Sequence, residues 1–209
     1  MILHLIGKRI DTDNLPVLFA PTVTADALEK DWTLHASEWV AEDGWYIGTN
    51  RDNGAGMMVS RRDFFGDIVL AFDARTIPPC THDIDCMWNG SWDAVAGMRG
   101  AAYVAGLQGW WTGKAGIEKS PDYKLNACTP LFHLEPGRTY HVTAGSAEGH
   151  CFLAVDGQLL MEMTDPDPID TSKHGKIGFE AYCSMFAVKN IQVKKMQWVS
   201  ELMHYEPEF

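Results

Sequence analysis

The stretch RTYHVTAGSAEGHCFLAVDGQLLMEMT, residues 138–164, decides the fold class. Within it, residues 150–155 and 158–164 are two runs dominated by apolar side chains, each with the length of a typical strand. Asp156-Gly157 lies between them, and this dipeptide is the strongest short-range signal of a β-hairpin. The stretch therefore predicts consecutive antiparallel strands.

The neighbouring residues alternate in the same way. In residues 138–145 every second side chain is apolar, which predicts a strand with one face in the core. Residues 175–182 repeat this pattern and place Glu180 and Tyr182 on the outer face. Residues 185–194 alternate with a switch near Asn190, which predicts a bulge or bend.

The rest of the chain adds short strand signals and almost no helix. Thr24 is a plausible N-cap for one or two helical turns over residues 25–32. Residues 66–75 are apolar on both faces, as expected for a central strand. The other predicted strands cover residues 2–6, 17–19, 32–39, 45–48, 57–61, 83–88, 101–107 and 115–118. About a dozen short strands separated by turns predict an all-β, antiparallel two-sheet jelly-roll sandwich.

Composition limits the domain organisation and the partners. The chain has 209 residues and no linker-like stretch, so we expect a single domain over 1–209 with a tail, 196–209, docked on it or forming a short helix. The net charge of −11 argues against nucleic acid or an anionic membrane as a partner. No run approaches the roughly 20 apolar residues of a membrane span.

Cysteine usage suggests the compartment. The five cysteines are scattered and form no CxxC pair, so reduced thiols are expected. The first apolar run is too short for a secretory signal segment. Together these features predict a cytoplasmic protein, and they leave a homodimer open.

Residues 80–119 are the best candidate for a functional region. They combine a close set of ionisable side chains with four of the eight tryptophans. Indole faces mixed with carboxylates and a guanidinium are typical of sites that bind a sugar. The alternative is that the tryptophans are core anchors and the charges line loops. The ionisable residues are His82, Asp83, Asp85, Asp93, Arg99, Lys114 and Glu118, and the tryptophans are Trp88, Trp92, Trp110 and Trp111.

Asp83 and Asp85 are the predicted catalytic carboxyls. Two residues apart on a strand, they share one face and can divide acid and base roles. Glycoside hydrolysis needs a second carboxyl across the bond, which Glu118 or Glu180 could supply. His82 is a candidate base or hydrogen-bond partner beside them. The alternative is that the aspartates form loop hydrogen bonds or hold a structural cation.

Substrate-binding roles are assigned to the side chains that could contact a sugar ring or its charge. Two of the four tryptophans are expected to be packing residues instead. The cations Arg99, Lys114 and Lys119 could pair with a uronate or remain solvated at the rim. The predicted binding residues are Trp88, Trp92, Arg99, Trp110, Trp111, Lys114, Glu180 and Tyr182.

No cofactor is predicted, although a structural or catalytic divalent cation stays open. Cys80, His82 and Cys86 are all potential zinc ligands, but their spacing matches no standard zinc site. Residues 164–170, TDPDPID, carry three aspartates. They could form a calcium loop, but the EF-hand pattern is missing, so an ordered acidic turn is favoured.

Two segments carry a resemblance to a known superfamily. WVAEDGWYIGTN followed by SRRDFFGDIVLAFDAR, and the ending from GRTYHVTAG to VKNIQV, resemble strands of concanavalin A-like lectin/glucanase domains over about four-fifths of the chain. The sequence is similar to small bacterial proteins of this fold linked to plant-glycan utilisation. More distantly it resembles keto-disaccharide hydrolase domains. The resemblance implies the fold more strongly than a reaction.

One motif of that superfamily is only partly matched. Its laminarinase-type glucanases carry Glu-x-Asp-x-Glu on the concave sheet, and the corresponding residues here resemble it as Asp83-Ile84-Asp85-Cys86-Met87. The third carboxyl, which is the family's acid/base, is replaced by Met87. This departure puts a standard retaining hydrolase in doubt.

The sequence thus predicts a carbohydrate-active protein. The favoured function is a glycoside hydrolase or lyase that acts on an oligosaccharide or modified glycoside bound on the concave sheet. The alternative is a non-catalytic carbohydrate-binding module or interaction subunit, which Met87 favours and the missing signal segment disfavours. A purely structural role comes third.

Overall fold

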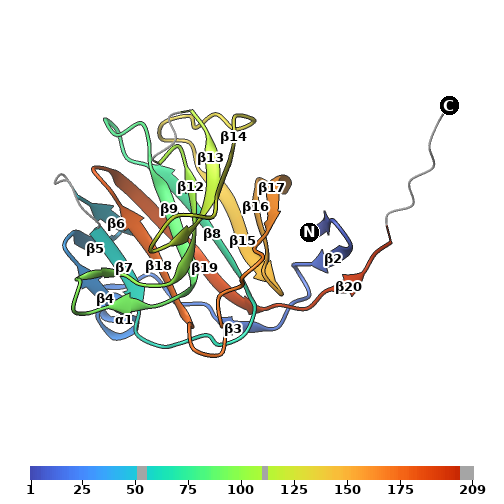
Figure 1. The fold of residues 1–209 in the computed structure, drawn as a ribbon. Coiled ribbons are helices and arrows are strands. Elements are labelled where there is room, and N and C mark those ends of the chain that lie inside the picture. Colours follow the sequence, from blue (N-terminus) through green and yellow to red (C-terminus); the bar gives the residue numbers. More distant parts are fainter. Residues whose placement is uncertain (51–55, 110–112, 203–209) are drawn as a thin grey trace.

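The structure is a computed structural model that describes residues 1–50, 56–109 and 113–202. Two antiparallel sheets face each other and enclose one large apolar core (Figure 1). The two-sheet antiparallel sandwich predicted from the sequence is therefore confirmed. Trp110 and Trp111, and the predicted tail from residue 203 onward, lie outside the described residues.

The first sheet has seven strands and carries the candidate site. From one edge to the other its strands are β14 (Asn126–Thr129), β13 (Ala115–Ser120), β12 (Ala102–Leu107), β9 (Ile84–Gly90), β18 (Lys176–Ala181), β7 (Gly56–Ser60) and β4 (Trp32–His35). Alternation decides which side chains face the core. On β18, Ile177 and Phe179 are buried between the sheets, as predicted.

The second sheet covers the other side of the core. Its strands are β17 (Gln158–Thr164), β16 (His150–Val155), β15 (Tyr140–Ala147), β8 (Ile68–Thr76), β19 (Met185–Lys195), β6 (Trp45–Thr49) and β5 (Glu38–Glu42), with β3 (Val17–Phe19) paired to β19. Tyr140, Val142 and Ala144 of β15 belong to the shared core, which confirms the alternation in residues 138–145.

Two local predictions in this sheet are also confirmed. The β16–β17 hairpin turns at Asp156 and Gly157, whose φ values of 49° and 82° are both positive, as a two-residue type I′ turn requires. In β19 the pairing with β8 shifts register between Lys189 and Gln192. Asn190 lies inside that bulge with a φ of 52°.

The segment 32–39 differs from its prediction as one strand. The structure divides it into β4 and β5, which belong to different sheets. Ala36 lies between them with a φ of 52°, a left-handed conformation that interrupts a strand. The alternation in the sequence changes phase here, because Trp32 and Leu34 occupy even positions and Trp39 an odd one, and the one-strand prediction did not use this sign.

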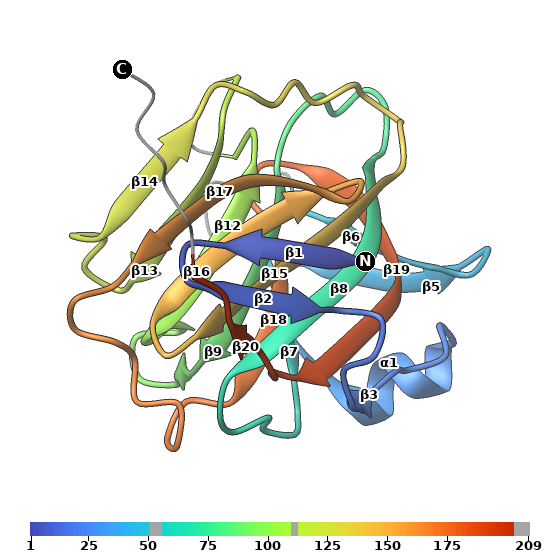
Figure 2. The same ribbon diagram turned by 90° about the vertical axis from the view of Figure 1, so that its right-hand side faces the viewer.

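The termini and the helix complete the fold. Helix α1 (Ala25–Asp31) is N-capped by Thr24, whose Oγ1 accepts a 3.1 Å hydrogen bond from the Ala27 amide, as predicted. β1 (Ile2–Leu5) and β2 (Lys8–Asp11) pair with each other, and β20 (Val199–Ser200) pairs with β2. Figure 2 shows β1 and β2 lying across the second sheet. Residues 196–202 form this short strand rather than a helix.

Within the three described ranges, no helix has the length and apolar character needed to cross a bilayer.

Candidate functional site

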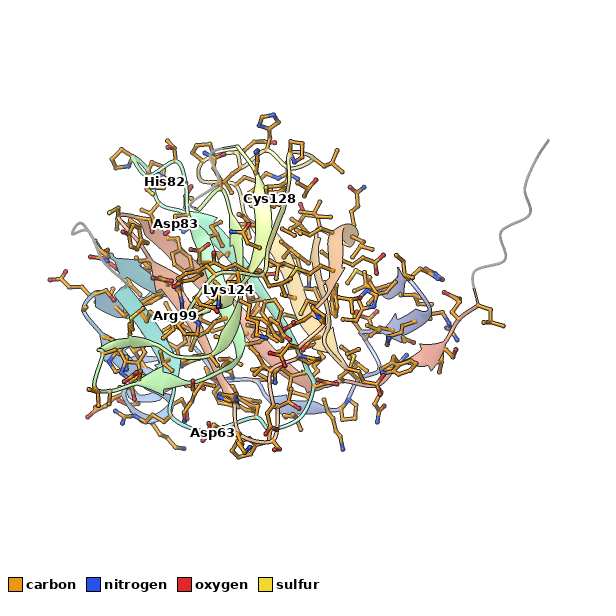
Figure 3. The ribbon with its side chains drawn as sticks, viewed as in Figure 1. Asp63, His82, Asp83, Arg99, Lys124 and Cys128 are labelled. Carbon is orange, nitrogen blue, oxygen red and sulfur yellow. The ribbon has the colours of Figure 1, made fainter. Side chains whose placement is uncertain are left out.

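A cavity of about 810 Å³ opens on the outer face of the seven-stranded sheet. Its walls come from three strands of the sheet, β9, β13 and β18, from β11 (Met98–Arg99) of a separate two-stranded hairpin, and from adjoining loops. Figure 3 shows His82, Asp83 and Arg99 along this side of the molecule. The lining residues are Ala36, His82, Asp83, Asp85, Gly97, Met98, Arg99, Gly109, Glu118, Tyr123, Glu180, Tyr182 and Cys183. All four predicted catalytic residues are therefore brought together.

Asp83 is fixed by the turn that follows β18. Its Oδ2 accepts 2.8 Å hydrogen bonds from the Tyr182 amide and from the Ser184 hydroxyl. The residue precedes β9 with a φ of 72°, a left-handed conformation that aspartate adopts more readily than most residues. Burial raises the pKa of Asp83, while Asp85 and the two donors lower it in part. The two donors therefore favour its ionised form.

Asp85 is the more deeply buried partner. It is 1% exposed, and burial raises its pKa well above the ordinary value, with further increases from the Asp83 charge and from a hydrogen bond with the Asp83 side chain. A hydrogen bond between two carboxyls needs a proton. Because Asp83 already accepts two other donors, Asp85 is the partner that keeps the proton. Asp85 Oδ1 has no hydrogen-bond partner.

Arg99 lies between two further carboxylates. Its Nη1 forms an ion pair with Glu180 Oε2, and its Nη2 lies 3.7 Å from Glu118 Oε1. Nη2 also donates a 3.3 Å hydrogen bond to the Tyr123 hydroxyl. All three ionic side chains are at least nine-tenths buried, so the charge of the guanidinium is offset inside the protein.

Glu118 is a carboxyl of the cavity wall whose charge changes near neutral pH. Burial raises its pKa from the ordinary value of 4.5 to about 7, and the Arg99 charge opposes this increase. At pH 7 it is therefore divided between the acid and the carboxylate, the state that suits a general acid or base.

A short hairpin delivers Arg99 to the cavity. β10 (Trp92–Asp93) pairs with β11 (Met98–Arg99), and Trp92 lies directly opposite Arg99. Trp92 stacks on His35 with the ring centroids 3.7 Å apart and packs on an apolar cluster that includes Met87. Trp92 does not line the cavity. It anchors this hairpin, which corrects its prediction as a sugar platform.

Two other predicted binding residues also lie elsewhere. Trp88 is fully buried in the core, and its indole N–H donates to Ser146 Oγ at 3.3 Å. The reason is parity, because even-numbered residues of β9 face inward and Asp85 faces outward. Lys114 is exposed and does not line the cavity. Trp88 is therefore a packing residue, and the binding role of Lys114 stays a prediction.

The sequence interpretation missed several residues of the wall. Tyr123, which contacts Arg99, sits in a turn after the strand that carries Glu118. An aromatic residue in a charged turn was its only signal. Gly109 was also missed, although a Cβ there would lie 3.0 Å from Oδ1 of both Asp83 and Asp85. The close approach of these carboxyls explains why this position has no side chain.

The metal hypotheses find little support in this geometry. Cys86 belongs to the core, whereas His82 lines the outer cavity, so the three potential zinc ligands do not converge. In the described part of the chain, no group of three or more His, Cys, Asp or Glu could hold a metal ion. Asp165 of the acidic loop accepts hydrogen bonds from the Tyr103 hydroxyl and the Asp167 amide, which makes the loop an ordered turn.

Met87 stands where the glucanase motif has its third carboxyl. It faces the same side of β9 as Asp85, but it packs with Met57 and Val59 in an apolar cluster. In the sheet, Val104 of β12 lies between Met87 and Glu118 of β13. The carboxyl missing from β9 thus has a counterpart two strands away.

The sandwich, its strand order and the cavity on its outer face define a concanavalin A-like jelly-roll fold. No protein-family model and no curated protein matches the sequence. Solved structures do match. A protein of unknown function with a galectin-like fold from Bacillus subtilis aligns with a TM-score of 0.68 and 16% identity, over 93% of this chain and 100% of the other.

Two further solved structures have names that mention carbohydrates. The carbohydrate-binding module CBM66 from Bacillus subtilis aligns with a TM-score of 0.62 and 14% identity, over 79% of this chain and 96% of the module. A structure described with endo-acting O-glycanases of the human gut microbiota aligns with a TM-score of 0.63 and 13% identity, over 87% of this chain and 100% of the other. At these identities the likeness establishes the fold.

Proposed function

We propose that this protein binds a carbohydrate in the cavity on the seven-stranded sheet and hydrolyses a glycosidic bond there. One observation carries the proposal. Asp85, protonated beside ionised Asp83, faces the same cavity as Glu118, whose pKa is about 7. Two carboxyls with different environments are what acid and base roles require. The carbohydrate-related names of two structural relatives support the choice of ligand.

The reaction divides between these two carboxyls. Asp85 donates its proton to the glycosidic oxygen as the bond to the anomeric carbon breaks. Ionised Glu118 accepts a proton from the water whose oxygen bonds to that carbon. One water is consumed and both sugar products leave with hydroxyl groups, so atoms and charges balance.

The spacing of the strands favours inversion of configuration. β12 lies between β9 and β13, and Glu118 is displaced by two residues along β13 from the position level with Asp85. At about 4.8 Å between strands and about 3.3 Å per residue, the two backbone positions are roughly 12 Å apart, and the side chains reach toward each other across the part of this gap that exceeds the carboxyl spacing. An inverting hydrolase places its carboxyls about 6.5–9.5 Å apart, and a retaining one about 5 Å. Glu180 lies directly opposite Asp85 on β18, but its ion pair with Arg99 assigns it to orienting that side chain.

Hydrolysis is favoured over elimination because Arg99 is already engaged by carboxylates of the protein. A lyase that removes the proton beside a uronate carboxylate needs a cation to neutralise the developing charge. Arg99, the arginine of the cavity wall, is already paired with two carboxylates.

The test is a mass-spectrometric time course of a mixed oligosaccharide and keto-glycoside pool with the purified protein. A water-added product should grow with the wild type. Asp85→Asn should slow its formation by about 10²–10⁴-fold, while titration calorimetry still detects binding of the sugar. Glu38→Gln, an exposed change on β5 in the other sheet, should turn over at the wild-type rate. Wild-type turnover by Asp85→Asn would exclude this mechanism.

A second candidate function is non-catalytic carbohydrate binding. It is favoured by Met87, which places an apolar side chain where the related glucanases carry their acid/base. An unchanged pool with saturable binding of the same sugars would select this function. No binding of any glycan would reject both.

A further inference from the structure

The described wall of the cavity carries more negative than positive charge. Asp83, Asp85, Glu118 and Glu180 contribute four carboxyl groups, Arg99 contributes the one guanidinium, and His82 contributes an imidazole near Asp83. Glu180 and Glu118 already offset that guanidinium. The hydrogen-bond donors to Asp83 from the turn after β18 are an amide and a hydroxyl, which are neutral. The described wall therefore holds a carboxylate charge that Arg99 does not balance.

Two other cations, Lys119 and Lys114, were predicted from the sequence as possible partners of a uronate. Lys119 is paired with other protein groups, and Lys114 lies outside the described lining of the cavity. Lys119 lies 2.9 Å from Asp165 Oδ2 and also donates to the Asp167 carbonyl. Lys114 is exposed outside the described lining. A ligand carboxylate would thus meet like charges in a partly desolvated cavity, where repulsion is stronger than in water.

A second observation points to the complementary ligand. Asp85 is 1% exposed, lines the cavity, and has an Oδ1 without a hydrogen-bond partner. Buried acceptors are normally satisfied, and a donor from the ligand would satisfy this one. An ammonium group offers three donors together with the charge that the wall lacks.

We propose that the cavity selects a sugar unit that bears a protonated amino group over its neutral counterpart, and rejects the corresponding uronate. This inference rests on the proposed carbohydrate function and names the substrate class of the same site. Arg99 has a role in it as well. Its Nε is also without a partner, and because its charge is offset it suits a neutral hydroxyl of the ligand.

The test uses free monosaccharides, which have no glycosidic bond and cannot be hydrolysed. Glucose, glucosamine and glucuronate, and the same three forms of galactose, are titrated calorimetrically into the full chain at pH 6.5. In the series that binds, we expect the amino sugar to bind roughly tenfold more tightly than the neutral sugar and the uronate to bind most weakly. A uronate that equals the neutral sugar, or an amino sugar that does not exceed it, overturns the inference.

Glu180→Gln sharpens the test because it frees the charge of Arg99. In this variant the amino-sugar preference should shrink and uronate affinity should rise, whereas Glu38→Gln should keep the wild-type order. An unchanged order in a folded Glu180→Gln variant also overturns the inference. If neither series binds and longer neutral or amino oligosaccharides fail too, the proposed function is wrong and this inference falls with it. If sugars bind but their affinities do not follow the order amino sugar, neutral sugar, uronate, this inference is wrong and the proposed function is unaffected.

Discussion

Ser184 Oγ donates a 2.8 Å hydrogen bond to Asp83 Oδ2, which links the turn after β18 to the residue that precedes β9. The Tyr182 amide donates to the same oxygen at the same distance. These two donors hold the carboxylate in place and leave Asp85 as its proton-bearing neighbour. Protonated Asp85 and ionised Asp83, called the acid–anion pair below, therefore form in the protein without a ligand.

The two aspartates should differ sharply in their effect on stability. Asp85→Asn keeps a neutral side chain that can donate to Asp83, so we expect a change within about 1 kcal/mol in the free energy of unfolding. Asp83→Asn removes the charge from an oxygen that accepts two hydrogen bonds, so we expect a loss of about 1.5–3 kcal/mol. Urea unfolding at pH 7 measures both. Equal losses would contradict the assignment of the proton to Asp85.

Replacement of Arg99 should strongly lower the free energy of unfolding, and a second substitution at Glu180 should restore part of the loss. Arg99→Met leaves Glu180 buried without its ion pair, and breaking a buried pair in this way costs about 3–5 kcal/mol. The double variant Arg99→Met/Glu180→Gln removes the orphaned charge and should recover part of that loss. The coupling is measured by a double-mutant cycle in urea, with Glu38→Gln as the matched amide control. Additive effects would show that the pair is not coupled.

Glu118 should make the protein less stable as the pH rises through the weakly acidic range. Below pH 4.5 the side chain is protonated in both states. From there to about pH 7 the unfolded chain releases the proton and the folded protein retains it, so the free energy of unfolding falls with pH. Above about pH 7 both states are ionised and the loss is complete.

Glu118→Gln tests this directly. Its stability relative to wild type should rise between pH 5 and pH 8 by about 1–2 kcal/mol, less than the full equivalent of the pKa change because the cavity is open to solvent. Glu38→Gln should show no such trend. A difference that stays flat with pH would place the pKa of Glu118 near its ordinary value.

Turnover should increase with pH around neutrality. If ionised Glu118 accepts the proton of water, kcat/KM rises as the pH passes the pKa of about 7 and then levels off while Asp85 remains protonated. The profile is measured on the substrate found in the mass-spectrometric test. A profile that only falls through pH 7 would instead make Glu118 the acid.

Gly109→Ala should impair the site more than the fold. The added methyl group would lie 3.0 Å from an oxygen of both Asp83 and Asp85, so it would press on the acid–anion pair. We expect reduced turnover or sugar affinity with a loss of stability of about 1–2 kcal/mol, typical of mild overpacking. Unchanged function in Gly109→Ala would show that the pair tolerates displacement.

The sequence predicted the fold and the acidic half of the site because both depend on alternation. Strand parity places Asp85 and Glu180 outward, and the Asp156-Gly157 turn fixes the β16–β17 register. The same rule could have removed Trp88 from the site, since it differs in parity from Asp85. Clustering in the sequence was the weaker guide in that case.

Pairings between distant segments could not be predicted. Arg99 reaches Glu180 because the β10–β11 hairpin folds back over the sheet, and no local pattern records that contact. The pKa of Glu118 likewise depends on burial by residues far away in the chain. The division of the chain at Ala36 did leave a local sign, the change of phase between Leu34 and Trp39, which the prediction of one strand did not use.

The interleaving of the two sheets has a consequence for how the molecule can be divided. The chain crosses from one sheet to the other between β3 and β4, β4 and β5, β6 and β7, β7 and β8, β8 and β9, β14 and β15, β17 and β18, and β18 and β19. No contiguous fragment contains the seven strands that carry the cavity without strands of the other sheet. A single cut in a loop should leave two pieces that function only as a reassembled pair, so the fold is suited to split-protein complementation and unsuited to truncation.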